Sequence, residues 1–217
     1  MFDSRPMLAR RSGEERTAPN RETLGGGRTV EHFSIPFDTV TVRIRDIEEK
    51  DVDVIVDYLH SASPEYLDAI NVDSIKLISR EATASRVRLA LPPPQGNAVS
   101  RAAVVAVVGE ELVAYSNIHI VSLDETYAHV HIVQPSWRGR GLASVLFVRV
   151  MRLFVNRYGI RNLCLETSPK NTKVNGLLKK FGLKPRIVRL EDPNGFAKAG
   201  EFCVYDVPRE VVQSWVL

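Results

Sequence analysis

The chain has 217 residues, which at roughly 150 residues per domain corresponds to one domain with an extension. Hydrophobic residues make up 44% and charged residues 25% of the sequence, which excludes a wholly disordered chain and a collagen-like fibre. The formal net charge is only +3, so nucleic acid, whose binding needs a clustered basic surface, is not an expected partner.

Residues 1–37 are predicted to form an arm that is flexible or docked on a partner subunit. Arg, Glu, Pro and Gly dominate this segment and its apolar residues are isolated, so it has little to bury. Residues 38–217 are predicted to form a single domain. The run Pro92–Gly96 marks a long loop within it.

The domain alternates between strand and helix patterns. Period-2 or short apolar runs between turn residues predict strands, at residues 40–44, 102–108, 112–121, 127–133, 163–167, 184–190 and 201–207. Helical spacing of apolar residues, with capping Ser, Pro and Gly residues, predicts helices, at residues 46–59, from 63 onward, at 142–158 and at 171–181. This order predicts a mixed α/β sheet with helices on its faces.

A glycine-rich turn, Arg138-Gly139-Arg140-Gly141, joins a predicted strand to the helix that begins at Leu142. The first amides of a helix have no intrahelical partners, and the helix dipole makes that end positive. Glycines leave the backbone open, and arginines add donors suited to phosphate oxygens. The turn therefore predicts a pyrophosphate site, although a tight turn with exposed arginines would have the same sequence. It is neither a GxGxxG nor a GxxxxGK[ST] motif.

The segment Val133–Ala143 resembles the acetyl-CoA-binding signature of the GCN5-related N-acetyltransferase (GNAT) superfamily. The signature, Arg/Gln-x-x-Gly-x-Gly/Ala, is matched by Arg138, Gly141 and Ala143. A second segment, Asn171–Gly182, is similar to the later asparagine-rich helix of the family and its closing glycine. The resemblance covers roughly residues 40–207.

This resemblance implies a mostly antiparallel, twisted sheet that splays between its fourth and fifth strands, here residues 127–133 and 163–167. Acetyl-CoA would lie in the gap. The backbone of Ile132 and Val133 would pair with the pantetheine arm, and the amides of the turn would hold the pyrophosphate. In addition to Ile132 and Val133, the resemblance implies these cofactor-binding residues: Arg138, Gly139, Arg140, Gly141, Leu142, Ala143, Asn171 and Asn175.

His129 and His131 are the candidate bases. They are one residue apart on a predicted strand, so both side chains lie on the same face. Acyl transfer to an amine requires removal of the ammonium proton, which a histidine can accept. The alternatives are two core histidines held by hydrogen bonds, or a metal site that would need a further ligand such as His119. We expect no metal, and Glu166 is the reserve base.

The general acid is not identified by the sequence. The family often places a Tyr in the later helix to protonate the leaving thiolate, and here that position is Leu178. A thiol pKa near 8.5 makes the thiolate a fair leaving group without an acid. Tyr205, Cys203 and Ser168 are other candidates. Backbone amides near Val133 are expected to stabilise the oxyanion.

The predicted function is an acyl-CoA-dependent N-acyltransferase, with direct attack of an amine on acetyl-CoA. The alternatives are a catalytically silent acyl-CoA-binding module and another nucleotide-phosphate enzyme. The acceptor could be a small-molecule amine or a protein or peptide amine, with its specificity in residues 60–100 and the late hairpin. Acidic residues could attract a cationic amine or form a solvated surface: Glu65, Asp68, Asp73, Asp124 and Glu125. A homodimer is common in the family.

The two cysteines, Cys164 and Cys203, lie in apolar runs and form no CxxC motif. We expect both to be buried free thiols in a reducing compartment. No stretch reaches the roughly 18 apolar residues that cross a bilayer, and the N-terminus lacks the apolar core of a secretory signal. The predicted location is the cytoplasm, without membrane association.

Overall fold

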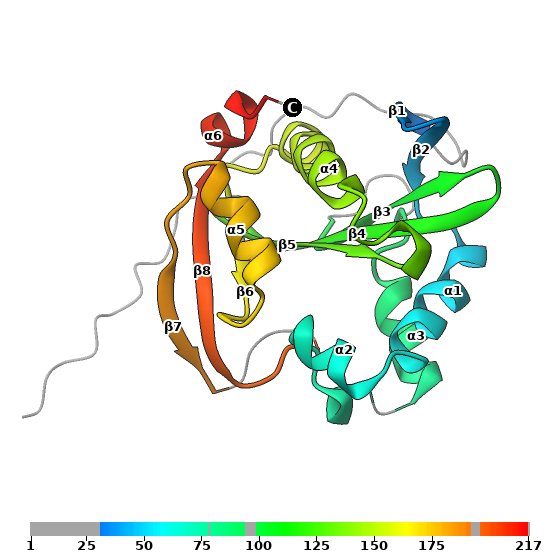
Figure 1. Ribbon diagram of the computed structural model, residues 1–217, viewed down its shortest axis with the longest axis horizontal. Helices are drawn as coiled ribbons and strands as arrows, with labels where there is room; N and C mark the ends of the chain where they lie inside the picture. Colours follow the sequence, from blue (N-terminus) through cyan, green and yellow to red (C-terminus); the bar gives the residue numbers. More distant parts are fainter. Residues whose placement is uncertain (1–30, 78, 94–98, 192–195, 217) are drawn as a thin grey trace, which may run out of the picture.

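The computed structural model describes residues 31–77, 79–93, 99–191 and 196–216. It confirms a mixed α/β fold, with one open sheet in the order β1-β2-β3-β4-β5-β6-β8-β7 (Figure 1). The strands are β1 (Glu31–Phe37), β2 (Val40–Asp46), β3 (Arg101–Val108), β4 (Glu111–Ser122), β5 (Glu125–Ile132), β6 (Asn162–Thr167), β7 (Arg186–Leu190) and β8 (Gly200–Pro208). The helices are α1 (Glu49–His60), α2 (Pro64–Ala69), α3 (Arg80–Arg88), α4 (Leu142–Tyr158), α5 (Thr172–Lys180) and α6 (Arg209–Ser214).

Neighbouring strands are antiparallel everywhere except between β5 and β6, which are parallel. These two strands pair only at Thr126–Leu163 and Tyr127–Cys164, although β5 continues to Ile132. Beyond Tyr127 they separate, so the sheet opens between the two strands where the family resemblance implied a gap. In Figure 1, β6, β8 and β7 run across the direction of β3, β4 and β5, as expected of a strongly twisted sheet.

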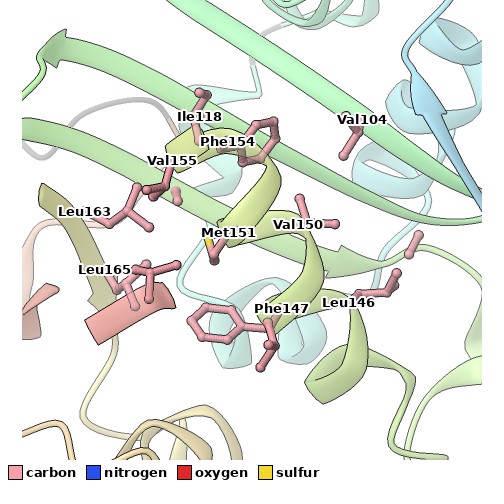
Figure 2. Close-up of a cluster of buried hydrophobic side chains, with 14 of the residues drawn as sticks. Val104, Ile118, Leu146, Phe147, Val150, Met151, Phe154, Val155, Leu163 and Leu165 are labelled. Carbon is pink, nitrogen blue, oxygen red and sulfur yellow. The ribbon is translucent and has the colours of Figure 1, made fainter. Parts of the chain in front are cut away.

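Helices cover both faces of the sheet because the central strand β3 is apolar on both sides. Alternate β3 residues pack in separate cores, namely Ala102, Val104 and Ala106 with α4, and Ala103, Val105 and Val107 with α1 and α3. The α4 side chains Leu146, Val150 and Phe154 are buried, and Figure 2 shows them facing the strands. Gly159 ends α4 in the left-handed conformation, which glycine adopts readily.

The sheet begins before the predicted boundary of the arm. The segment Glu31–Phe37 forms β1 and pairs antiparallel with β2, so the prediction that the arm extends to residue 37 is wrong over these residues. Phe33, Ile35 and Phe37 alternate along the strand, and all three contact the core on the α4 side. This period-2 signal was present in the sequence. The rest of the predicted arm, residues 1–30, lies outside the described residues.

Three further elements differ from the predictions. Helix α1 begins at Glu49 rather than residue 46, because Asp46 ends β2 and its buried carboxylate bonds Arg157 and His32. Helix α3 was not predicted, since its buried residues include Thr83 and Ala84 and leave no clear apolar stripe. Helix α6 was also not predicted. Of the predicted loop Pro92–Gly96, residues 94–96 lie outside the described residues.

None of the helices in the described ranges is both long and apolar enough to cross a membrane.

Candidate active site

The glycine turn lies between a short 3₁₀ turn (Pro135–Trp137) and the first residue of α4. Gly139 has φ 77° and Gly141 has φ 90°, which are conformations that L-residues rarely adopt. A Cβ atom built at either glycine would meet no heavy atom within 4 Å. The glycines are therefore required by the backbone conformation, and the space in front of the turn is open.

Backbone amides make this turn an anion site. Between Arg138 and Ser144, no amide donates to a backbone carbonyl of the described residues. The amide of Ser144 donates to Gly141 at 3.0 Å, which is the first bond of α4. With 17 residues, α4 also directs a substantial dipole at the turn. The open glycines, the unpaired amides and the positive helix end together fit a pyrophosphate.

The two arginines of the turn are held by the protein. Arg138 donates from Nε to the carbonyl of Ile132 (3.2 Å) and from Nη2 to the carbonyl of Val133 (3.1 Å), and its guanidinium lies 4.0 Å from the centre of the Tyr66 ring. Arg140 donates to Asp38 at 2.6 Å. Both side chains are thus engaged away from the open turn, and the donors that face it are amides.

Replacing Arg138 by Leu should lower the free energy of unfolding by about 2 kcal/mol, because two carbonyls lose a charged donor. Arg140→Leu is the matched control. Its ion pair with Asp38 is between exposed side chains and should contribute less than about 1 kcal/mol. Urea denaturation of both variants measures the difference, and equal losses would show that Arg138 has no special structural role.

The backbone of β5 presents alternate residues to the gap. The amide of Val133 donates to Val113 at 2.9 Å, and the carbonyl of His129 accepts from the Ser116 hydroxyl, so these groups point toward β4. By alternation, the amide of Ile132 points away from β4 and toward the gap. Among the amides near Val133 that we expect to stabilise the oxyanion, that of Val133 itself is already bonded to Val113. Ile132 is the donor that remains.

The three candidate bases line one cavity of about 300 Å³. His129 and His131 reach it from β5, and Glu166 reaches it from β6. The parallel register Tyr127–Cys164 places His129 and Glu166 at the same level on the two separating strands and on the same face. The cavity lies on the side of the sheet covered by α1 and α3, since Tyr58, Leu59 and Val87 form part of its wall.

The environments of the two histidines differ. His131 lies between aromatic rings, with Tyr115 at 6.1 Å between centroids, and its Nδ1 is 3.3 Å from the Tyr58 hydroxyl. Desolvation, with a smaller effect of His129, lowers the pKa of His131 to about 3. Desolvation, then Arg101 and His119, lowers the pKa of His129 to about 4. Both rings are neutral at neutral pH, but the His129 side chain is exposed to the cavity and is the one that a substrate can reach.

The environment of Glu166 suits a reserve base. The residue is half-buried, and desolvation, followed by repulsion from Glu125, raises the pKa of its carboxyl. A raised pKa moves a carboxylate toward the range useful for proton transfer near neutral pH.

Helix α5 contains no tyrosine that could act as the general acid. Leu178, at the position where the family often has that tyrosine, is buried in the core. Tyr205 donates to Asn175 Oδ1 at 2.9 Å, and burial raises the pKa of its hydroxyl. Asn175 also donates to the carbonyl of Ser168 at 2.9 Å, so its side chain ties α5 to β6 and β8. Asn171 caps α5 by accepting from the amide of Val174. Both predicted asparagines therefore have structural partners at the carboxyl end of β6.

The acidic residues proposed to attract a cationic amine do not line this cavity in the described part of the chain. Two of them are occupied on the surface, Asp68 with Lys198 and Asp124 with Arg161. Among the described residues, no group of three or more His, Cys, Asp or Glu is arranged to hold a metal.

The acetyltransferase (GNAT) family model matches residues 75–183, half of the chain. Similar folds are found in RimJ of Mycobacterium smegmatis with a CoA disulfide (TM-score 0.64, 12% identity, 83% of this chain and 90% of that one) and in ribosomal-protein-S5-alanine acetyltransferase from Vibrio fischeri (0.62, 13%, 86% and 100%). Spermidine N-acetyltransferase from Vibrio cholerae, solved with CoA and spermine, is another (0.61, 12%, 80% and 98%). At these identities the likeness shows the fold alone. No curated protein matches the chain.

The chain belongs to the GNAT family, whose members are acyl-CoA-dependent N-acetyltransferases. CoA or acetyl-CoA is the cofactor of this family and is bound in several of the similar structures.

Proposed function

We propose that this protein transfers an acetyl group from acetyl-CoA to a primary amine by direct attack in a ternary complex. One arrangement carries the proposal: the opening between β5 and β6 adjoins a cavity that contains His129 and Glu166, and the β5 end of that opening leads to the amide-lined turn. An anion-binding end and a proton-accepting cavity are the two parts that acyl transfer from a thioester requires.

Each part of the chain has a separate task in this proposal. Acetyl-CoA, when bound, supplies the thioester. The amides of residues 139–143 hold the pyrophosphate, and the gap-facing backbone of Ile132 hydrogen-bonds the pantetheine arm or the oxyanion. His129 accepts the ammonium proton directly or through a water, with Glu166 as the second candidate. Tyr205, which lies opposite Leu165 of β6, is a candidate acid, and thiolate can also leave without an acid.

The test is to incubate the purified protein with acetyl-CoA and a panel of primary amines and to follow thiol release. Amine-dependent release supports the proposal. Tight CoA binding with no turnover on any amine would support the silent module, which the replacement of the usual phenol by buried Leu178 favours. If nucleotides protect the protein from heat better than CoA does, a nucleotide-phosphate enzyme is the better description.

The pH dependence should show no histidine of ordinary pKa. Because the pKa of His129 is lowered to about 4, its ring stays neutral as the pH falls through 6.5 and becomes protonated only near pH 4. A plot of log(kcat/KM) against pH should therefore be straight from about pH 5.5 to about pH 8. Initial rates at low amine concentration measure it. A bend near 6.5 would contradict this description of His129.

The finer features of location and assembly stay predictions. Cys164 and Cys203 are free and buried, which supports a reducing compartment such as the cytoplasm. The prediction of a homodimer rests on the family resemblance. Sedimentation of the purified protein would measure its oligomeric state.

A further inference from the structure

The charge of the acceptor cavity is the opposite of what a polyamine would require. The ionisable side chains in its wall include two arginines, Arg86 and Arg101, against one carboxylate, that of Glu166. The histidines of the wall have lowered pKa values and add no positive charge at neutral pH. The described part of the cavity is therefore cationic.

Arg101 is the cation best placed to meet a ligand. It begins β3 and lies on the face that bears Ala103 and Val105, which is the cavity side of the sheet. Its guanidinium forms no hydrogen bond or ion pair with any group in the described residues, although the residue is half-buried. A half-buried guanidinium with five donors and no partner in the described part of the chain is a strong site for an anion.

The sheet register places Arg101 within reach of the candidate base. Arg101 lies opposite His119 on β4, and His129 lies opposite Asn117 on the same strand. The two backbones are thus two strand spacings apart, about 10 Å, and displaced by two residues, about 7 Å. An extended arginine side chain crosses much of this separation. Consistently, the charge of Arg101 adds to desolvation in lowering the pKa values of His129 and His119.

The rest of the wall suits a compact ligand with an apolar part. Ile55, Leu59, Val72 and Val87 line the cavity beside the charged groups. Phe196 is also part of the wall, and the guanidinium of Arg86 is 4.9 Å from its ring centre. Asn117, on β4 between the strands that carry Arg101 and His129, adds an amide that can serve as donor or acceptor.

We propose, on the basis of the function proposed above, that the acceptor is a primary amine that also carries an anionic group, a carboxylate or a phosphate, and that Arg101 binds this group while the amine lies at His129. The site thus selects amino acids, aminoalkyl phosphates and related compounds over polyamines.

The experiment compares matched amines that differ only in the anionic group. The pairs are phenylalanine with phenethylamine, and phosphoethanolamine with ethanolamine, with spermidine as a polyamine. Each is tested for kcat/KM with the wild type, Arg101→Gln and the control Arg149→Gln, which removes an exposed arginine of α4 that does not line the cavity. CoA affinity of each variant reports whether the fold is intact.

The wild type is expected to prefer the anionic member of at least one pair by about tenfold or more, because a charge-assisted bidentate contact is worth at least one order of magnitude. Arg101→Gln should remove that preference and leave the neutral amine within about twofold, whereas Arg149→Gln should change neither. Whichever pair shows the preference identifies the anion as carboxylate or phosphate.

Turnover of amines with no preference for either anionic member, or a preference that survives in Arg101→Gln, overturns the inference and leaves the proposed function standing. If no amine is turned over, product binding still tests the anion site independently of the proposed function. The CoA-loaded protein is titrated by calorimetry with N-acetylphenylalanine and N-acetylphenethylamine, and with the N-acetyl derivatives of phosphoethanolamine and ethanolamine. Tighter binding of an anionic product that depends on Arg101 then supports the anion site while the acetyltransferase proposal fails. Equal binding within both pairs rejects the anion site.

Discussion

Substitution of Gly141 by Glu should weaken CoA binding by at least about 100-fold, which corresponds to about 2.7 kcal/mol. Gly141 has φ 90° at the start of α4, so a side chain there strains the turn. The carboxylate would also stand where amides and the helix dipole favour an anion, and would repel the pyrophosphate. Equilibrium binding of CoA by calorimetry measures the loss.

Two controls separate charge from strain in this experiment. Gly141→Gln adds the same volume and the same backbone strain without the charge, and should bind CoA better than Gly141→Glu. Gly159→Glu places the same residue in a left-handed glycine at the other end of α4, and should lose stability but little CoA affinity. If Gly141→Glu binds CoA as the wild type does, the pyrophosphate site is elsewhere.

His129→Ala should lower kcat about 100-fold and leave CoA affinity within about twofold. Loss of a general base commonly costs two to four orders of magnitude, and this ring faces the acceptor cavity rather than the glycine turn. Steady-state kinetics at saturating acetyl-CoA measures kcat, and calorimetry measures the affinity.

The controls for His129→Ala come from the same cavity. His119→Ala removes a ring from the neighbouring strand and should change kcat by less than about fivefold, since His119 lies opposite Tyr127 and farther along the sheet from the gap. Glu166→Gln tests the reserve base on β6. Full turnover in His129→Ala together with a large loss in Glu166→Gln would assign the proton transfer to Glu166.

Periodicity located most of the fold. Runs such as 102–108 became β3 because every residue between Ala102 and Val107 is buried, and a strand with apolar residues on both faces is easily recognised. Helix α3 and strand β1 were not predicted, because their apolar patterns are weaker. Thr83 and Ala84 in α3 are buried without being strongly apolar, and Phe33 and Ile35 in β1 follow a polar segment that conceals their alternation.

The site was only partly predictable. Same-face placement of His129 and His131 followed from strand alternation, and the open glycine turn followed from its sequence. The partners of Arg138 did not, because they depend on how the chain folds back on the ends of β5 and α2. The charge of the cavity could not be predicted from the sequence, since Arg101 and Glu166 come to line one cavity only through strand pairing between segments far apart in sequence.

The two-pair contact between β5 and β6 divides the sheet into a five-strand part and a three-strand part. The larger part carries Arg101, His129 and the wall of α1 and α3, whereas the smaller part carries Glu166. A single core under α4 joins the two parts, because it contains Ile118 and Ala128 of the larger part and Leu163 and Leu165 of the smaller one. Packing of both parts against one helix therefore fixes how far apart the histidine-bearing strand and the glutamate-bearing strand stand.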